Sequence, residues 1–173
     1  MQSQEKFDQQ LKALGEYDSF FTSKEIKYLP EILREDEKLN GLTSGFYKGN
    51  TWLIALTDSR LIFLDKGMLW GLEQIEIPHD KINSVEYKRG LLLADIIVWD
   101  GASKVEIENV DKDLGKLFVD AINTSLHAYK NKGHTLTQPI DIASQLEKLA
   151  QLKEKGILTD EEFQAQKKKL LAA

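Results

Sequence analysis

The side chains best suited to catalysis or metal binding are few in this sequence of 173 residues. There is no cysteine, which excludes disulfides, thiolate zinc sites and cysteine nucleophiles. The histidines are His79, His127 and His134, and no two of them have the spacing that places zinc ligands on one helix face. The sequence therefore predicts no metal site.

Acidic residues near a histidine also fail to form a catalytic set. Glu76 precedes His79 by three positions, but the stretch is strand-like and a proline interrupts it, so no helix face unites them. His79 and Asp80 are adjacent and would point to opposite faces of a strand. Asp111 and Asp113 are typical of a helix start. With no glycine-rich phosphate loop and no Gly-x-Ser-x-Gly turn, we expect a protein without a cofactor that is not an enzyme.

The net charge and the N-terminal residues limit the possible partners and the expected location of the protein. The 23 basic and 28 acidic residues give a net charge of −5, which argues against nucleic-acid binding. The start of the chain is polar, Gln2 replaces the glycine that myristoylation needs, and no apolar run approaches the ~20 residues of a membrane span. We expect a cytoplasmic protein whose membrane contacts, if any, are peripheral.

Residues 1–35 are expected to be helical. Phe7, Leu11 and Leu14 follow a helical spacing that Gly15 can end.

A second helix is expected to start after Thr22. Glu25 would complete a capping box with Thr22, and Phe21 and Ile26 would form a hydrophobic staple. Pro30 predicts a kink or break in this helix.

The pattern then changes to that of a sheet. Apolar and β-branched residues alternate or cluster between turn signals, which predicts about seven strands. The expected strands are 38–47, 51–56, 60–64, 68–77, 82–87, 92–99 and 104–108. A helix from about Asp111 has one apolar face. That face consists of Leu114, Leu117, Phe118, Ala121, Ile122 and Leu126. The fold class is thus α+β, a bent antiparallel barrel or sandwich closed by a helix.

The chain is predicted to divide into an N-terminal helical segment at 1–35, the β domain with its helix at 36–130, a polar linker at 131–139 and a helical hairpin at 140–173.

The hairpin carries the clearest signals. Gly156 can end its first helix, and Thr159 with Glu162 forms a capping box for the second. Lys167 to Lys169 either compensate the helix dipole or form a patch for lipid or nucleic acid. Two short helices bury too little apolar surface to be stable alone, so we expect self-association or docking. The candidate contact residues are Leu146, Leu149, Leu152, Leu158, Phe163 and Leu170.

The run from Leu146 to Phe163 closely resembles the short C-terminal domain family called SHOCT. The leucine spacing, the Gly-Ile-Leu-Thr turn and Glu-Glu-Phe match together over about the last thirty residues. The resemblance implies an oligomerisation or protein-docking module.

The run from Thr51 to Gly67 resembles the bacterial pleckstrin-homology-like family, as do the segments 75–78 and 81–85. The resemblance spans about 30–128 and implies the bent β fold with its closing helix. A phosphoinositide pocket needs several converging basic residues, yet Lys48 and Arg60 lie beside Asp58 in a region, 36–130, with a charge of 11 − 15 = −4.

Two ligand-contact candidates remain open in the β domain. Arg60 either contacts a ligand or secures its hairpin by pairing with Asp58 or a backbone carbonyl. Met68, Leu69 and Trp70 belong either to a buried strand or to an apolar loop tip that contacts a protein or membrane.

We therefore expect a non-catalytic binding and assembly protein. Its β domain binds a protein or peptide, and its hairpin assembles the chain in cis or in trans. The alternative is a peripheral protein that binds anionic membranes through the 68–72 loop, Lys48 and other scattered lysines.

Overall fold

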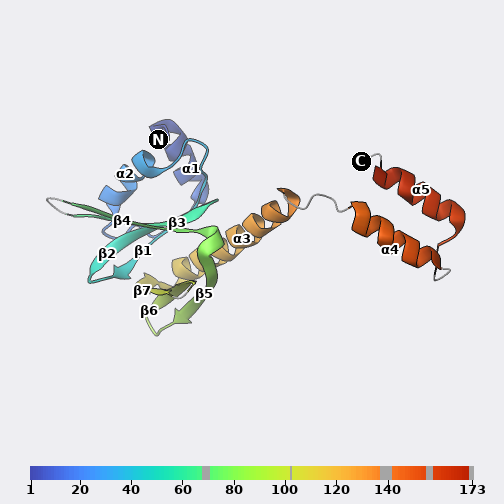
Figure 1. Ribbon diagram of the computed structural model, residues 1–173. Helices are drawn as coiled ribbons and strands as arrows, with labels where there is room; N and C mark the ends of the chain where they lie inside the picture. The colour runs from blue at the N-terminus through green and yellow to red at the C-terminus, as the bar shows by residue number, and fades with distance from the viewer. Residues whose placement is uncertain (68–70, 102, 137–141, 155–157, 172–173) are drawn as a thin grey trace. The chain divides into compact units, whose positions relative to one another are not determined.

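The computed structural model describes residues 1–67, 71–101, 103–136, 142–154 and 158–171 (Figure 1). The chain forms two compact units, Met1–Asn131 and Lys132–Ala173.

The first unit is built on seven antiparallel strands, as the sequence predicts. In sheet order they run β4-β3-β2-β1-β7-β6-β5, and each strand pairs with its neighbours in antiparallel register. Their bounds are β1 Leu39–Tyr47, β2 Asn50–Thr57, β3 Arg60–Lys66, β4 Leu72–Pro78, β5 Ile82–Arg89, β6 Leu93–Asp100 and β7 Ser103–Asp111. A short 3-10 turn, His79–Lys81, joins β4 to β5.

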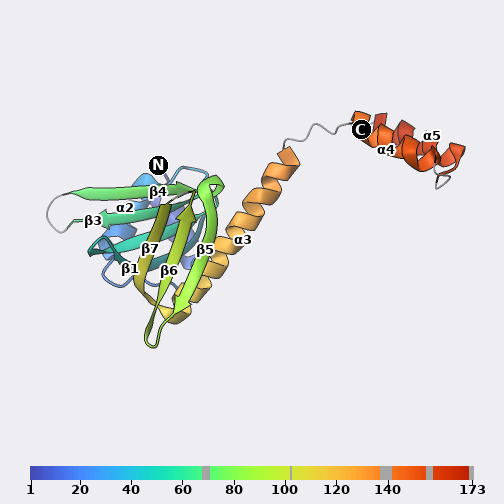
Figure 2. The same ribbon diagram turned by 60° about the horizontal axis from the view of Figure 1, so that its bottom comes forward.

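The sheet changes direction between β1 and β7. These strands share a single register pair, Phe46 with Glu108, so the two halves of the sheet cross rather than lie flat (Figure 2). Asn109 follows that pair with a φ of 58°, and its N–H donates to the Asp95 carboxylate. A left-handed residue at this point turns β7 away from β1, which ends the pairing.

Two hydrophobic cores lie on opposite faces of the first half-sheet. Ile54 and Leu56 of β2 pack toward the second half-sheet and the long helix α3, Lys112–Leu136. Their neighbours Leu53 and Ala55 pack with Leu29 on the other face, beneath the N-terminal helices (Figure 1). Successive strand residues point to opposite faces, so burial on both sides explains the uninterrupted apolar run of β2.

The N-terminal helices are α1, Gln4–Leu14, and α2, Ser23–Ile32. Gly15 ends α1 with a φ of 74°, as predicted. The predicted capping box of α2 is wrong. The Thr22 side chain makes no capping bond, and the Glu25 carboxylate instead accepts the Lys66 N–H at 2.9 Å.

The predicted staple is also wrong, and of the kink or break predicted at Pro30 the break is not found. Phe21 is 76% exposed and stacks on Phe20 rather than covering Ile26. Pro30 lies inside α2, which continues to Ile32. The proline is buried in the second core region, so tertiary packing outweighs the lost backbone hydrogen bond.

The long helix α3 runs from Lys112 to Leu136. Asp111 caps it by accepting the N–H groups of Asp113 and Leu114, both at 2.9 Å. The predicted linker therefore begins too early, because residues 131–136 continue the helix. Polar residues suit an exposed helix end as well as a loop, so composition did not separate the two.

The second unit contains the hairpin helices α4, Ile142–Glu154, and α5, Asp160–Leu171. The predicted capping box at α5 is confirmed. Glu162 accepts the Thr159 N–H at 2.9 Å, and the Glu162 N–H donates to the Thr159 hydroxyl at 3.3 Å. Gly156, the predicted end of α4, lies outside the described residues.

We expect the first unit to fold without the hairpin. A chain ending at Leu136 keeps both hydrophobic cores, which lie entirely within residues 1–131. Circular dichroism should retain the β signal and show one cooperative thermal transition. A broad, non-cooperative transition would mean that the hairpin stabilises the β domain.

Candidate functional site

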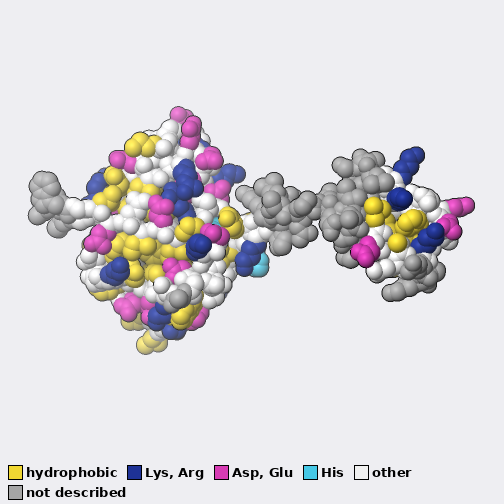
Figure 3. Space-filling model, viewed as in Figure 1, with side chains coloured by type: hydrophobic (Ala, Val, Ile, Leu, Met, Phe, Trp, Pro, Cys, Tyr) yellow, Lys and Arg dark blue, Asp and Glu magenta, His cyan; other side chains and the backbone are white. Residues whose placement is uncertain are grey.

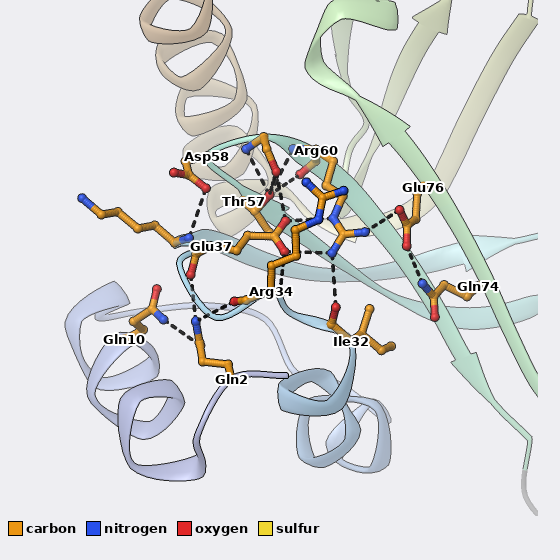
Figure 4. Close-up of polar contacts among 12 residues, drawn as sticks. Gln2, Gln10, Ile32, Arg34, Glu37, Thr57, Asp58, Arg60, Gln74 and Glu76 are labelled. Carbon is orange, nitrogen blue, oxygen red and sulfur yellow. Dashed lines mark hydrogen bonds and ion pairs between the residues drawn. The ribbon is translucent and has the colours of Figure 1, made fainter.

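Arg60, a predicted ligand contact, lies at the start of β3 inside a polar cluster (Figure 4). Its Nε and Nη2 donate to the two carboxylate oxygens of Glu37, each at 2.8 Å. Nη2 also donates to the Ile32 carbonyl at 3.2 Å, and Nη1 pairs with Glu76. The guanidinium is buried, and its partners all lie within the fold.

The turn before Arg60 explains how the cluster is held. The Thr57 hydroxyl accepts the Arg60 N–H and donates to the Arg60 carbonyl, both at 3.0 Å. Asp58 accepts the Lys38 N–H at 3.1 Å and makes no hydrogen bond or ion pair with Arg60. Of the two partners suggested from sequence, the backbone carbonyl is found and Asp58 is not. Glu37, the main partner, lies 23 residues upstream and carries no motif that marks it.

The Glu37 carboxyl has an unusually low pKa. Burial alone would raise it, but the hydrogen bond from Arg60, the bond from the Arg34 N–H and the Arg60 charge together lower the pKa to about 2. The carboxylate therefore remains ionised throughout the physiological range. Because its partner is also an internal residue, this charge stabilises the fold and is not free for acid–base chemistry.

The low pKa predicts acid sensitivity. Glu37 titrates near 4.5 when unfolded and near 2 when folded, so its contribution is complete above pH 4.5 and is lost as the pH falls toward 2. The loss amounts to about 3 kcal/mol of unfolding free energy. Urea unfolding between pH 6 and pH 3 should show a steeper decline in the wild-type chain than in Glu37→Gln. Equal slopes would contradict the assignment.

His79 is buried but lacks a catalytic setting. Its ring meets Tyr129 edge-on at 5.6 Å, and neither ring nitrogen has a hydrogen-bond partner. Burial lowers its pKa against the opposing charges of Asp58 and Glu37. Within the described residues, no group of three or more His, Asp or Glu side chains is placed to hold a metal ion.

A groove on the first unit has the features of a binding surface. It has a volume of about 390 Å³ and lies where β1, the start of β6, the end of β7 and the α1–α2 connection meet. Phe20, Phe46 and Leu93 contribute its apolar walls. Asp18, Ser44, Thr51, Gly45, Asn109 and Asp111 complete the lining. This volume lies near the lower end of the range for ligand pockets.

The β5–β6 turn next to Leu93 is an exposed apolar tip. Leu91 and Leu92 are 90% and 79% exposed, and the turn is closed by the Gly90 N–H bonded to the Leu93 carbonyl at 2.9 Å. Lys88 and Arg89 lie directly before it, with exposed side chains. Leu92 was predicted to begin a strand, but it lies in the turn before β6. Consecutive leucines are unusual in a turn, and they were the sequence signal that could have revealed this tip. Figure 3 shows other hydrophobic side chains reaching the surface among charged ones.

The remaining predicted contacts are dispersed. Lys48 occupies the β1–β2 turn with a φ of 50°, and its Nζ lies 5.3 Å from the Tyr47 ring centre. Met68, Leu69 and Trp70 lie outside the described residues. In the hairpin, Lys153 Nζ lies 5.3 Å from the Phe163 ring centre and also pairs with Asp160. The structure does not bring Lys48 and Arg60 into one phosphate pocket.

The bent antiparallel sheet with its closing helix, and the separate helical hairpin, define a two-module protein of the pleckstrin-homology class. The chain belongs to the bacterial PH domain family, whose model matches residues 33–124. Residues 144–171 match the model of the short C-terminal domain, SHOCT. Both resemblances predicted from sequence are confirmed.

Other known proteins match this chain at low sequence identity. An uncharacterized protein of Archaeoglobus fulgidus is 27% identical over 150 residues, covering 68% of this chain and 79% of the relative. A duf1696 family protein with a pleckstrin-homology domain from Shewanella loihica is 21% identical, covering 59% of this chain and 94% of that structure, with a TM-score of 0.41. A pleckstrin homology domain from Shewanella amazonensis is 22% identical, covers 55% and 90%, and has a TM-score of 0.38.

None of the described helices combines the length and the apolar character that spanning a bilayer requires.

Proposed function

We propose that this chain is a non-catalytic binding and assembly protein. Its PH domain binds a protein or peptide segment, and its SHOCT hairpin joins copies of the chain or docks on a partner. The groove at β1, β6 and β7, with its exposed apolar side chains, supports the binding role. The partly exposed apolar side chains of the hairpin support the assembly role.

The observation that carries the assembly role is the incomplete burial of the hairpin. Leu146, Leu149, Leu158 and Phe163 are all only half-buried, and Leu152 is exposed. No hairpin residue whose side chain is described is fully buried. Two helices with an apolar seam of this kind gain stability by covering it with another surface.

Sedimentation velocity of the full chain and of the chain ending at Leu136 tests the assembly role. We expect the full chain to form an oligomer at tens of micromolar and the truncated chain to have a smaller state. A full chain that stays monomeric over this range would contradict self-assembly.

Phe163→Ala should weaken assembly more than Lys168→Ala. Phe163 is half-buried at the start of α5, whereas Lys168 is exposed near its end. Truncating a buried phenylalanine costs ~3–5 kcal/mol in a core, which we reduce to about 1–3 kcal/mol for a small, open interface. A lysine near a helix end contributes only ~0.3–1 kcal/mol, and salt screens it.

Dissociation constants from sedimentation at low and high salt provide the measurement. If Lys168→Ala weakens assembly more than Phe163→Ala does, or if the wild-type oligomer dissociates in high salt, the contact is electrostatic.

A second candidate function is peripheral binding to anionic membranes. The exposed Leu91 and Leu92 favour it, because an apolar tip with Lys88 and Arg89 behind it suits the interface of a bilayer. The contact predicted at residues 68–72 is the other candidate. Flotation with phosphatidylglycerol vesicles tests the idea. Binding that is lost in Leu91→Ser/Leu92→Ser or in Trp70→Asp would support it, and no flotation of the wild-type chain would reject it.

A further inference from the structure

We infer that the groove lined by Phe20, Phe46 and Leu93 binds a protein segment in which a bulky apolar side chain lies beside a lysine or arginine. This inference rests on the proposed function and specifies the chemistry of the partner of the PH domain.

The apolar side chains that line the groove are exposed to solvent, although the sheet around them is well packed. Phe20, Phe46 and Leu93 are 66%, 39% and 44% exposed, although two of them belong to strands of a well-packed sheet. They come from three separate elements and converge on one hollow. Convergence of apolar side chains around a concave site is the usual arrangement of a binding pocket.

The loop that supplies Phe20 is held in place rather than loosely attached. The Asp18 carboxylate accepts the Phe20 N–H at 2.9 Å and the Ser44 hydroxyl at 2.6 Å, which ties the loop to β1. The next residue, Phe21, has a φ of 56°, a left-handed conformation that costs energy for a bulky side chain. The loop is therefore fixed at the groove before a partner arrives, which reduces the entropy lost on binding.

The charge of the groove selects the partner. Asp18 and Asp111 are its ionisable lining residues, and no lysine or arginine lines it. Glu108, which pairs with Phe46 across the strands, is exposed next to the groove and adds to the same sign. A cationic side chain is complementary to this rim, whereas the headgroup of an anionic lipid is repelled by it.

The groove is suited to binding rather than to reaction. The Ser44 hydroxyl donates a hydrogen bond to the Asp18 carboxylate, and no histidine lines the groove. A nucleophilic serine needs a neighbouring general base, most often a histidine, that accepts its proton in a competent geometry.

Titration of the full chain with three acetylated and amidated tetrapeptides tests the inference by amide NMR. The probe KLFK carries both the apolar and the cationic features, ELFE reverses the charge, and KSSK removes the apolar side chains. We expect KLFK to shift the amides of Phe46, Leu93 and Asn109, and to bind at least about fivefold more tightly than either of the others. No shift at these amides, or equal binding of ELFE, would overturn the inference.

Variants separate the two features of the site. Phe20→Ser should weaken KLFK binding by about fivefold, because the removed ring is largely exposed and its loss leaves the core intact. The matched control is Leu72→Ser. Leu72 is 41% exposed on the edge strand β4 and does not line the groove, so this change should leave binding unchanged. Asp18→Asn/Asp111→Asn should remove the preference for KLFK over ELFE. The new amide oxygens can still accept the Phe20 N–H and the N–H groups that begin α3, and the Ser44 hydroxyl would accept from the new amide at position 18 instead of donating. Equal KLFK binding by wild type and Phe20→Ser would overturn the assignment.

A titration with lipid vesicles is the last test of the groove assignment. If phosphatidylglycerol vesicles broaden the groove amides while KLFK has no effect on them, the surface belongs to a membrane contact and the inference is wrong. The oligomeric state of Phe163→Ala is measured independently. Failure of the peptide titration with assembly intact rejects the groove assignment alone.

Discussion

Replacing Glu37 by alanine is expected to lower the free energy of unfolding by about 3–5 kcal/mol, the typical cost of breaking a buried ion pair. The change leaves the Arg60 guanidinium buried, with Glu76 and one carbonyl as its remaining acceptors. It also removes the acceptor of the Ser59 hydroxyl at 3.1 Å and of the Arg34 N–H at 3.0 Å. Equilibrium urea unfolding gives the measurement.

Glu76→Ala is the matched control, because Glu76 pairs with the same arginine but its side chain is 35% exposed. We expect a loss below about 1 kcal/mol for that variant, as for other ion pairs open to solvent. Glu37→Leu/Arg60→Met, which removes both charges, should recover most of the stability lost in Glu37→Ala. If the two alanine variants were equally destabilised, burial of the pair would not be the source of the effect.

Gly45→Ala should destabilise the first unit by about 1–3 kcal/mol or more. A Cβ atom at this position of β1 would lie 2.3 Å from Ile107 Cγ2 and 3.0 Å from Val110 Cγ2. Both side chains are fully buried, so neither can move aside without disturbing the core. Gly45 allows β1 and β7 to cross closely at the point where the two half-sheets meet.

Gly41→Ala provides a graded comparison within the same strand. Its added Cβ would lie 3.1 Å from the edge of the Phe118 ring, a tighter contact than usual but not a clash. Thermal unfolding should therefore rank the variants with Gly45→Ala well below Gly41→Ala. The reverse order would show that the crossing of β1 and β7 has room to relax.

The sequence alone determined the elements whose signals are local. The seven strands were predicted because their apolar and β-branched residues alternate or cluster between turn residues, as in β2 and β3 around Thr57 to Ser59. The Thr159 and Glu162 capping box was predicted because both partners lie within one helical turn. Local patterns of this kind depend on residues a few positions apart, so they survive without knowledge of the fold.

The tertiary structure decided which of these local signals prevailed. Thr22 and Glu25 have the same capping spacing as Thr159 and Glu162, yet the Glu25 carboxylate binds the distant Lys66 N–H instead. Pro30 does not end α2, because that helix is packed against a core. A long-range partner competes with the local one, and the sequence spacing cannot show which of them is closer.

The candidate binding surface also depended on the tertiary structure. Phe20, Phe46 and Leu93 are 26 and 47 residues apart in sequence, so no motif connects them. The crossing of β1 with β7 places Phe46 near Leu93, and the bonds of Asp18 to Phe20 and Ser44 hold Phe20 beside them. Arg60 was the opposite case: its position after a turn left open a ligand contact or a role in securing the hairpin, and the guanidinium is bound by Glu37 from a separate connection. Charge and burial are properties of neighbours in space, which is why the sequence determined the modules of this protein and the fold determined its surfaces.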